Sequence, residues 1–583
     1  MVTNKYITRI ASVIMAAAVI LCLMASLFSD KLQEVYGNNA VTMKYESKLF
    51  NTDQIMDIDI LMDEDDWNNM LKNAISEEYY SCNVVVNGKT FYSVGIRPKG
   101  NTSLSSIVND PDTDRYSFKL EFDHYIEGQT CYGLDKLILN NNYADATNMK
   151  EAIVYDMYQY LGVDASLYNY AKISVNGDYQ GVYLALEAVE DSFMLRNYGT
   201  ENGNLYKPES MGVGGGVDGK DGDGWQMGEK PDGEDFSQNG EMPDGEDFPQ
   251  KGEMPDGEDF PQNGEMPDGE DFPQKGEMPD RDNIPQMGEA PNGEAADIKM
   301  GIMGENGGAD LNYTDDDLDS YSTIWDGEIT DTDKKDHKRV VEALKNISEG
   351  TDLETYMDID NILKYMAVHT FVVNDDSLSG TMAHNYYLYE YNGRLNILPW
   401  DYNLSFGGMS MDGKMGGQSS GATSVINDAI DTPFSITDFF DALLENEEYL
   451  EQYHGYLNEL VEKYVNGGEF EKTYERIRSQ IDDLVGDDPT AFYSYEEYEK
   501  AANMLMEVVQ LRAKSVSGQL AGTIPSTDEG QQDSSNLIDG SDIDLSIMGS
   551  FSGGGGKNGD PGNVPQTSEE KADLQDSNQD SVK

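Results

Sequence analysis

The sequence predicts an α+β protein whose first half is rich in short strands and whose second half is helical. Alternating apolar residues and Asn-Gly turns dominate residues 55–188, and amphipathic helical patterns dominate residues 333–520. Between the halves lies an acidic repeat with too few apolar residues to join either core. A chain of 583 residues is long enough for one large domain, or two, with appendages.

These patterns divide the chain into five predicted regions. We expect a targeting segment at residues 1–30, a sheet-rich part at 31–206, a disordered acidic insert at 207–320, a helical part at 321–522 and a disordered tail at 523–583.

Acidic residues dominate the composition. The chain has 109 Asp and Glu against 40 Lys and Arg, and its formal net charge is −69. Much of this charge lies in the insert, which repeats units such as GEMPDGEDFPQK at residues 240–251. These units bury too little apolar surface to offset the entropy of ordering, so we expect disorder and at most weak cation binding. The net charge also excludes nucleic acid as the default partner, because phosphate binding needs a basic surface.

The first 30 residues indicate export. Lys5 and Arg9 precede an uncharged apolar run at residues 10–28, which is long enough to cross the hydrocarbon core of a membrane. An uncleaved anchor and a cleaved signal peptide are both consistent with this pattern. We therefore expect a cell-membrane-anchored, extracytoplasmic protein, or a secreted one if the segment is cleaved.

Three cysteines leave two structural alternatives. Cys22 lies in the apolar run, so only Cys82 and Cys131 could form a disulfide. An exported protein may join them, but thiols on predicted strands are also ordinary small core residues.

The sheet-rich part consists of short segments separated by tight turns. Asn-Gly pairs at 87–88 and 176–177 are hairpin signals. We predict strands at residues 55–60, 81–86, 90–96, 116–122, 134–140, 170–175 and 181–188, and helices at 65–71 and 147–161. The strands are expected to form an antiparallel sheet.

Three cations in this part could contact a ligand. Arg97 and Lys99 belong to the Gly- and hydroxyl-rich turn at residues 95–103, whose N–H groups and cations could cradle phosphates. A plain solvated loop is the alternative. Lys119 lies on the polar face of the strand at 116–122, which is the usual place of a solvated lysine.

Two acids in this part also stand out. Glu151 lies in the first turn of the helix at residues 147–161, where the helix dipole favours a carboxylate. Glu187 interrupts an apolar run, which indicates a sheet edge or a cleft.

The helical part surrounds one predicted hairpin. Its strands are residues 385–391 and 395–399, and a Gly-, Met- and Ser-rich loop follows at 407–424. Helices are predicted at residues 333–348, 358–373, 435–445, 448–465, 469–485 and 494–520.

Carboxylates lie on both sides of this hairpin. Asp375 and Asp376 precede it and Asp401 follows it, so folding the hairpin would bring them to one end. Phosphoryl transfer needs such a set: a cation for the phosphates, carboxylates or amides for Mg²⁺, and an acid that positions the acceptor hydroxyl.

Six motifs in a fixed order resemble one known family, the spore-coat protein H (CotH) kinases, an atypical protein-kinase-like branch. The motifs are RPKGNTS at 97–103, SFKL at 117–120, NGDYQGVY at 176–183 with Glu187, NDD at 374–376, HNYYLY at 384–389 and PWDYN at 399–403. The resemblance implies a bilobal protein-kinase-like fold with a sheet-rich N-lobe and a helical C-lobe.

The resemblance also implies a role for each candidate residue. Asp401 would ligate Mg²⁺ with Asn385 as a second ligand, and Asp376 or Asp375 would orient the acceptor hydroxyl. Lys119 would bind phosphate with Glu151 as its ion-pair partner. The remaining candidates for the nucleotide are Arg97 and Lys99 in the glycine turn and Glu187 in the segment that would read adenine.

The implied activity is transfer of the γ-phosphate of ATP, with Mg²⁺, to Ser or Thr of exported coat or surface proteins. Two alternatives are a catalytically weak kinase-like scaffold or adhesin, and an enzyme that transfers another group such as AMP. The sequence does not indicate an oligomeric state.

Overall fold

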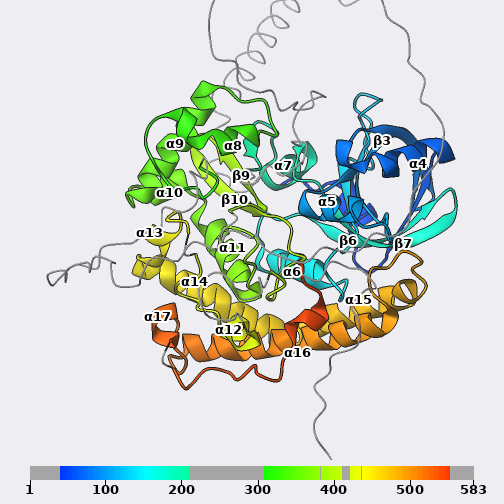
Figure 1. Ribbon diagram of the computed structural model, residues 1–583. Helices are drawn as coiled ribbons and strands as arrows, with labels where there is room; N and C mark the ends of the chain where they lie inside the picture. Colours follow the sequence, from blue (N-terminus) through cyan, green and yellow to red (C-terminus); the bar gives the residue numbers. More distant parts are fainter. Residues whose placement is uncertain are drawn as a thin grey trace, which may run out of the picture. The chain divides into compact units, whose positions relative to one another are not determined.

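The computed structural model describes residues 40–208, 308–380, 383–409, 421–434, 436–532 and 534–551 (Figure 1). The predicted targeting segment and the repeats of the acidic insert lie outside these residues, as does the middle of the loop at 407–424. All described residues belong to one compact unit.

Seven strands of the first half form a closed barrel in the order β1-β2-β3-β4-β5-β7-β6. Neighbouring strands are antiparallel except β1 and β6, which run parallel and close the barrel. The strands are Met56–Leu61 (β1), Tyr80–Val86 (β2), Lys89–Lys99 (β3), Ser117–Glu121 (β4), Lys136–Asn140 (β5), Tyr168–Val175 (β6) and Asp178–Glu187 (β7).

The closed barrel corrects the prediction of a bilobal protein-kinase-like fold with an antiparallel N-lobe sheet. Ile58 of β1 pairs with Val86 of β2 on one side and with Ile173 of β6 on the other. Because β1 uses both edges, the sheet closes and no edge strand is left unpaired. The antiparallel prediction was therefore wrong for the β1–β6 pair.

Alternation along the strands fills the barrel with apolar side chains. Val94, Ile96, Phe118 and Leu120 are buried in one core cluster on β3 and β4. Cys82 and Cys131 join the same cluster as free thiols, so they pack in the core and do not form a disulfide.

Both predicted hairpin turns form within the barrel. Asn87 and Gly88 have φ of +49° and +79°, and Asn176 and Gly177 have +53° and +88°. Positive φ at both central residues is the geometry of a tight hairpin turn that asparagine and glycine favour.

Helices surround the barrel and make up most of the second half. Those of the first half are Lys44–Lys48 (α3), Glu64–Lys72 (α4), Thr102–Val108 (α5), Lys150–Leu161 (α6) and Asp191–Tyr198 (α7), with a short turn at Ala74–Ser76 (η1). Those of the second half are Leu318–Tyr321 (η2), Ser322–Asp326 (α8), Lys334–Ser348 (α9), Leu353–Tyr356 (α10), Ile359–Val372 (α11), Ala422–Asn427 (α12), Asp441–Leu444 (α13), Glu447–Glu459 (α14), Leu460–Val465 (η3), Glu469–Gly486 (α15) and Tyr495–Leu520 (α16).

Helix α11 is the centre of the helical part and contacts α6, α14 and α16 (Figure 1). Its C-terminal end is held by Arg512 of α16, which is 1% exposed. The guanidinium donates to the carbonyl oxygens of Thr370 at 2.8 Å and Phe371 at 3.1 Å. A buried cation at this end satisfies carbonyl groups that no later helical turn can reach.

A small sheet lies beside α11. It has the order β10-β9-β8, formed by Asn204–Tyr206 (β8), Tyr386–Tyr391 (β9) and Arg394–Pro399 (β10). β9 and β10 are the predicted hairpin, joined at Asn392 and Gly393. β8 comes from the end of the first half and pairs with β9.

Buried polar contacts join the barrel to the helical part. Arg115, just before β4, donates to Asp488 after α15 at 2.8 Å and to the carbonyl oxygen of Val182 at 2.6 Å. Tyr464 of η3 donates to Asp156 of α6 at 2.7 Å. The two parts therefore share an ordered polar interface.

The described chain after α16, up to residue 551, packs back on the protein, whereas the sequence predicts a flexible tail from residue 523; residues 552–583 lie outside the described residues. It forms Asp528–Gln531 (α17) and Leu545–Met548 (η4). Met548 is buried and its carbonyl oxygen accepts a hydrogen bond from Ala146 at 3.1 Å. The N–H of Phe551 donates to Gly408 at 3.2 Å.

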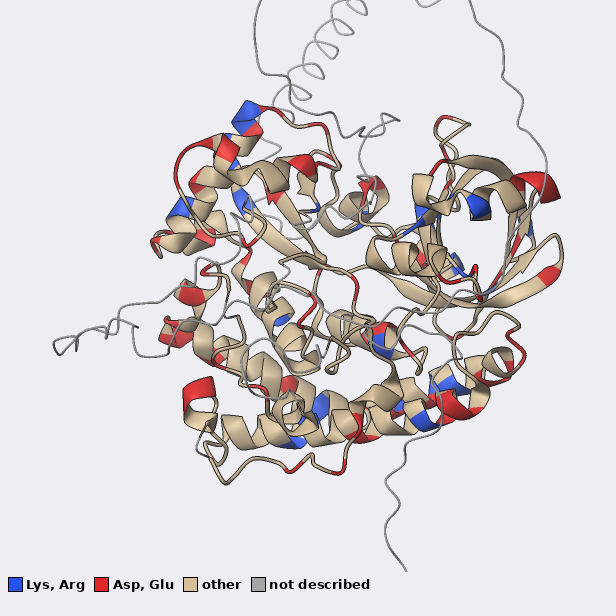
Figure 2. Ribbon diagram, viewed as in Figure 1, with Lys and Arg blue, Asp and Glu red and all other residues tan. Residues whose placement is uncertain are grey.

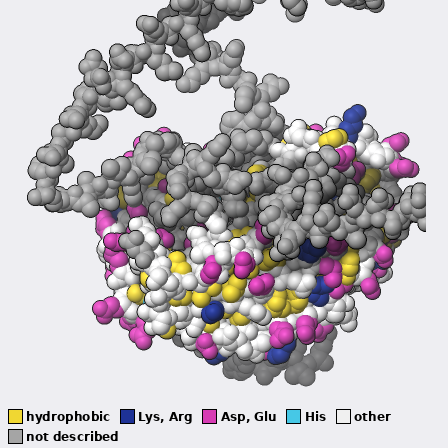
Figure 3. Space-filling model, turned by 60° about the horizontal axis from the view of Figure 1, so that its bottom comes forward, with side chains coloured by type: hydrophobic (Ala, Val, Ile, Leu, Met, Phe, Trp, Pro, Cys, Tyr) yellow, Lys and Arg dark blue, Asp and Glu magenta, His cyan; other side chains and the backbone are white. Residues whose placement is uncertain are grey.

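Acidic side chains are spread over both the barrel and the helical part (Figure 2). On the face shown in Figure 3, they are scattered among apolar side chains and a few basic ones.

No helix in the part of the chain that the structure describes is long and apolar enough to cross a membrane. This finding corrects the prediction of membrane anchoring through an N-terminal segment, which has no support in the described residues. The apolar run at residues 10–28 lies outside the described residues.

Candidate active site

The two acidic clusters lie at one end of the β9–β10 hairpin. α11 ends at Val372, and the left-handed φ of +49° at the next residue, Val373, turns the chain into residues 374–376. Asp401 is separated from the end of β10 by Trp400 alone, and the strand register pairs Tyr386 with Pro399. The structure thus brings the acids before and after the hairpin together, as the sequence pattern suggests.

Asp376 is buried and held from both sides. Its Oδ1 accepts from His384 Nε2 at 2.8 Å, and its Oδ2 accepts from Asn385 Nδ2 at 2.9 Å. The same amide also donates to the backbone carbonyl of Asp376 at 2.8 Å. Asp375, by contrast, is exposed to solvent. Of the two neighbours, Asp376 is therefore the acid with a fixed orientation.

Asp401 is half-buried and has a left-handed φ of +60°. Burial raises its pKa, the charge of Lys99 opposes that rise, and the charge of Asp376 adds to it. Its backbone carbonyl lies 3.4 Å from the side-chain nitrogen of Asn374. A non-glycine residue held in this conformation is costly, and such residues cluster at functional sites.

Glu151 adds a third carboxyl group from the first turn of α6. It is 4% exposed. Its Oε2 accepts from Asn140 Nδ2, at the end of β5, at 2.9 Å. Its Oε1 is buried and has no hydrogen-bond partner among the described residues. Burial raises the pKa of Glu151 to about 8, and the charge of Asp401 contributes to the rise.

Lys99, at the end of β3, is the cation next to these acids. Burial lowers the pKa of Lys99 to about 8, while the charges of Asp401 and Glu151 oppose the decrease. Its Nζ lies 5.5 Å from the centre of the Trp400 ring, adjacent to Asp401. The lysine of the predicted glycine turn is thus the one that reaches the acid cluster.

Lys119 lies elsewhere on the outer face of the barrel. Its Nζ is 2.8 Å from Glu190 Oε1, and Lys136 pairs with the same carboxylate. The predicted ion pair between Lys119 and Glu151 is not among the contacts that the structure shows; Glu190 takes that place.

Two other predicted nucleotide contacts are engaged in structural pairs. Arg97 pairs with Glu77. Glu187 is fully buried and bonds to Arg196 at 2.6 Å and to the Tyr45 hydroxyl at 2.5 Å. Each side chain is therefore satisfied within the barrel and its surrounding helices.

Lys207 is a site residue that the sequence reasoning missed. It follows β8, and its charge affects the pKa of both Lys99 and Asp401. Its Nζ lies 5.9 Å from the centre of the Tyr387 ring, and that ring packs edge-to-face on Trp400 at 5.3 Å. A lone lysine at the border of the acidic insert gives no sequence signal of its own.

The model of the family described as CotH kinase protein matches residues 96–262 and 274–516 of this chain. These two segments make up well over half of the sequence and include Lys99, Glu151, Asp376 and Asp401. The chain belongs to the CotH kinase family. No curated protein matches it.

Membership of the CotH kinase family suggests a kinase-like enzyme that uses a nucleotide and a divalent metal in general terms. In the described residues, no group of three or more His, Cys, Asp and Glu side chains forms a ready-made metal site. Mg²⁺ is usually held by one or two carboxylates together with substrate phosphates, so a smaller set suits it. Asp401, Asp376 and the Oδ1 of Asn374, which is buried and has no partner in the described part of the chain, are oxygen donors of the kind that Mg²⁺ prefers.

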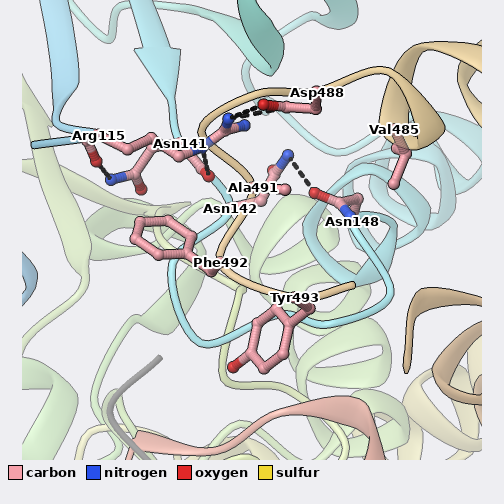
Figure 4. Close-up of a pocket in the computed structure, with 9 residues that line it drawn as sticks. All are labelled: Arg115, Asn141, Asn142, Asn148, Val485, Asp488, Ala491, Phe492 and Tyr493. Carbon is pink, nitrogen blue, oxygen red and sulfur yellow. Dashed lines mark hydrogen bonds and ion pairs between the residues drawn. The ribbon is translucent and has the colours of Figure 1, made fainter. Parts of the chain in front are cut away.

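A small pocket lies apart from these acids (Figure 4). Its walls come from Arg115 just before β4, from the segment between β5 and α6, and from the end of α15 with its connection to α16. The polar groups in it pair with each other: Asn142 donates to Asn148 at 2.9 Å, and Arg115 bonds to Asp488. The pocket is part of the interface between barrel and helices, and none of Glu151, Asp376 and Asp401 lines it.

Proposed function

We propose that this member of the CotH kinase family is an ATP- and Mg²⁺-dependent protein kinase that transfers the γ-phosphate to Ser or Thr hydroxyls of protein substrates. One observation carries the proposal: the charges of Glu151 and Asp401 act on Lys99, and that of Asp376 acts on Asp401, although these residues come from distant segments. Placing carboxyl groups close together out of bulk water is unfavourable, and such clusters are candidate functional sites.

Asp376 is the group that would accept the proton of the substrate hydroxyl. His384 and Asn385 fix its two oxygens, so its remaining lone pairs have a defined direction. A carboxylate in a fixed orientation can position a hydroxyl and take its proton as the oxygen attacks phosphorus.

Lys99 is the group that would bind the phosphates of ATP. With a pKa of about 8, its ammonium is mostly protonated at neutral pH. A half-buried cation attracts phosphate more strongly than one in bulk water, because less solvent screens its charge.

Asp401 would hold Mg²⁺, with the side-chain oxygens of Asn374 or Asn385 as further ligands. The metal would supply positive charge that neutralises the phosphates during transfer. A cation there would also remove the repulsion among the carboxyl groups.

Incubation with radiolabelled ATP and Mg²⁺ tests the proposal. The acceptors are the protein itself and casein, a serine-rich probe, and intact-mass spectrometry separates an added phosphate from an added AMP. We expect label transfer by the wild-type protein, a loss of at least about 100-fold for Asp401→Asn, and little change for Asp375→Asn.

Absence of transfer by a wild-type preparation that binds ATP, seen as a thermal shift, would contradict the proposal. Addition of AMP instead of phosphate would identify a different transferase reaction. Full activity of Asp401→Asn would remove that residue from the metal site.

A further inference from the structure

A single buried histidine connects the two loops that carry Asp376 and Asp401. His369 lies in the last turns of α11 and is 1% exposed. Its Nε2 is 2.8 Å from Ser379 Oγ, in the loop after Asp376. Its Nδ1 is 3.0 Å from the hydroxyl of Tyr402, the residue after Asp401.

The surrounding hydrogen bonds fix the direction of these contacts. Ser379 Oγ lies 2.8 Å from the carbonyl oxygen of Asn374 and donates its single proton to it. The hydroxyl of Ser379 must then accept from His369, so Nε2 carries the hydrogen. Nδ1 of the neutral ring accepts from the Tyr402 hydroxyl, which in turn lies 2.5 Å from the hydroxyl of Tyr158.

The environment of the ring favours this neutral form. His369 stacks on Tyr365 at 5.3 Å and on Phe434 at 5.4 Å, with Tyr402 edge-on at 5.9 Å. Burial lowers the pKa of His369 to about 3. The ring therefore keeps one donor and one acceptor, one for each loop, throughout the neutral range.

A second hydrogen bond between the loops is longer than the two that His369 makes. The side-chain nitrogen of Asn374 lies 3.4 Å from the carbonyl oxygen of Asp401, at the long end of hydrogen-bond distances. The two bonds of His369 are shorter, and the one to Tyr402 is buried. Small displacements of catalytic groups cost large factors in rate, so the separation of the two loops matters for transfer.

We propose that His369 is a positioning residue that fixes Asp376 relative to Asp401 by bridging their loops through Ser379 and Tyr402. The inference rests on the proposed kinase function for its kinetic consequence. The bridge itself has a structural consequence that needs no activity.

Hydrogen–deuterium exchange tests the bridge directly. His369→Phe keeps a ring of similar size and removes both bonds. We expect the amides of Gly380, which donates to Ser377 in its own loop, and of Phe406, which donates to Val372 at the end of α11, to exchange about tenfold faster or more, together. His337→Phe is the matched control, because His337 also stacks on an aromatic ring, Trp325 at 4.0 Å, and bonds to a carboxylate, but in α9.

Kinetics of phosphate transfer test the positioning role. We expect His369→Phe to lower kcat by about 10- to 100-fold and to change the KM for ATP by less than about threefold. His369→Asn retains an acceptor for Tyr402, and His369→Gln retains a donor for Ser379, so each should restore part of kcat. These milder variants also serve if the Phe variant does not fold.

Combining variants tests whether His369 acts through its hydrogen bond to Ser379, because the effects on kcat should then not add. Ser379→Ala should lower kcat in the wild type but add little in His369→Asn, which already lacks the Ser379 bond. Unchanged exchange in His369→Phe, a change in one loop alone, or the same effects in His337→Phe would overturn the inference. If the wild type transfers no phosphate, the kinase proposal fails, and the exchange measurement still decides whether the bridge exists.

Discussion

The carboxylate of Asp401 raises the pKa of Glu151, although one residue follows β10 of the helical part and the other begins α6 beside the barrel. Neither acid forms an ion pair with a neighbouring arginine in the described contacts. Their proximity therefore lowers the stability of the ligand-free protein, and this cost has measurable effects.

Asp401→Asn should make the metal-free protein more stable. Burial and the charge of Asp376 raise the pKa of Asp401, so the charged form is disfavoured in the folded state at neutral pH. A neutral amide of the same shape removes this penalty, and we expect a gain of roughly 1 kcal/mol in the free energy of unfolding. Denaturant unfolding in EDTA measures it. A loss of stability would contradict the electrostatic account of the site.

Glu151→Gln should flatten the pH dependence of stability. The pKa of Glu151 is about 8 in the folded protein against an ordinary value of 4.5. A raised pKa means that its stabilising contribution is complete below pH 4.5 and is lost as pH rises to 8. Wild-type stability should therefore fall by about 1.4 kcal/mol per pH unit more steeply than that of the variant between pH 5 and 8.

Glu190→Gln is the control for this titration. The ammonium groups of Lys119 and Lys136 hold the pKa of Glu190 at about 2, against the effect of burial. It is charged in both folded and unfolded protein between pH 6 and 8. Its variant should lower stability by a constant amount there and leave the slope unchanged. An equal change of slope in both variants would show that Glu151 is not the titrating group.

Asp376→Asn and Asp375→Asn should differ in transfer activity. Asp376 is held by His384 and Asn385, whereas Asp375 is exposed. We expect a loss of about 100- to 10,000-fold in kcat for Asp376→Asn and less than about threefold for Asp375→Asn. Steady-state kinetics with saturating ATP measure it. The reverse order would assign the proton acceptor to Asp375.

Lys99→Met and Lys119→Met should separate nucleotide binding from stability. Lys99 lies beside the acids, so its variant should raise the KM for ATP by about 10- to 100-fold. Lys119 pairs with Glu190, so its variant should lose roughly 1–3 kcal/mol of stability with a near-normal KM. Kinetics and denaturant unfolding of both variants measure these effects. A raised KM for ATP only in Lys119→Met would contradict the prediction and assign phosphate binding to Lys119, as the family resemblance implies.

Local patterns predicted the part of the site that follows from the hairpin. The turn at Asn392 and Gly393 predicts β9 and β10, and their pairing brings Asp376 and Asp401 to one end. The first-turn position of Glu151 also agrees with α6. These features depend on residues close in the chain, which a pattern of turns and alternation can reveal.

The closure of the barrel and the partners of the two lysines depend on long-range packing, which local patterns do not reveal. Closure of the barrel depends on the parallel pairing of β1 with β6, for which neither strand carries a local signal. Lys99 and Lys119 lie on the same face of paired strands, with Lys119 opposite Arg97 and Lys99 opposite Ser117. Only the position of each lysine relative to the helical part determines that one reaches the acids and the other Glu190.

The segment after α16 is part of the folded protein, although it lies beyond the end of the family match. The family match ends at residue 516, inside α16, but Met548 and Phe551 bond to Ala146 and Gly408, near the start of α6 and in the loop after Asp401. A gene fragment cut at the family boundary would encode a protein in which the loop after Asp401 and the start of α6 lack this support. Recombinant work on relatives should therefore choose its C-terminal limit from packing and not from sequence similarity.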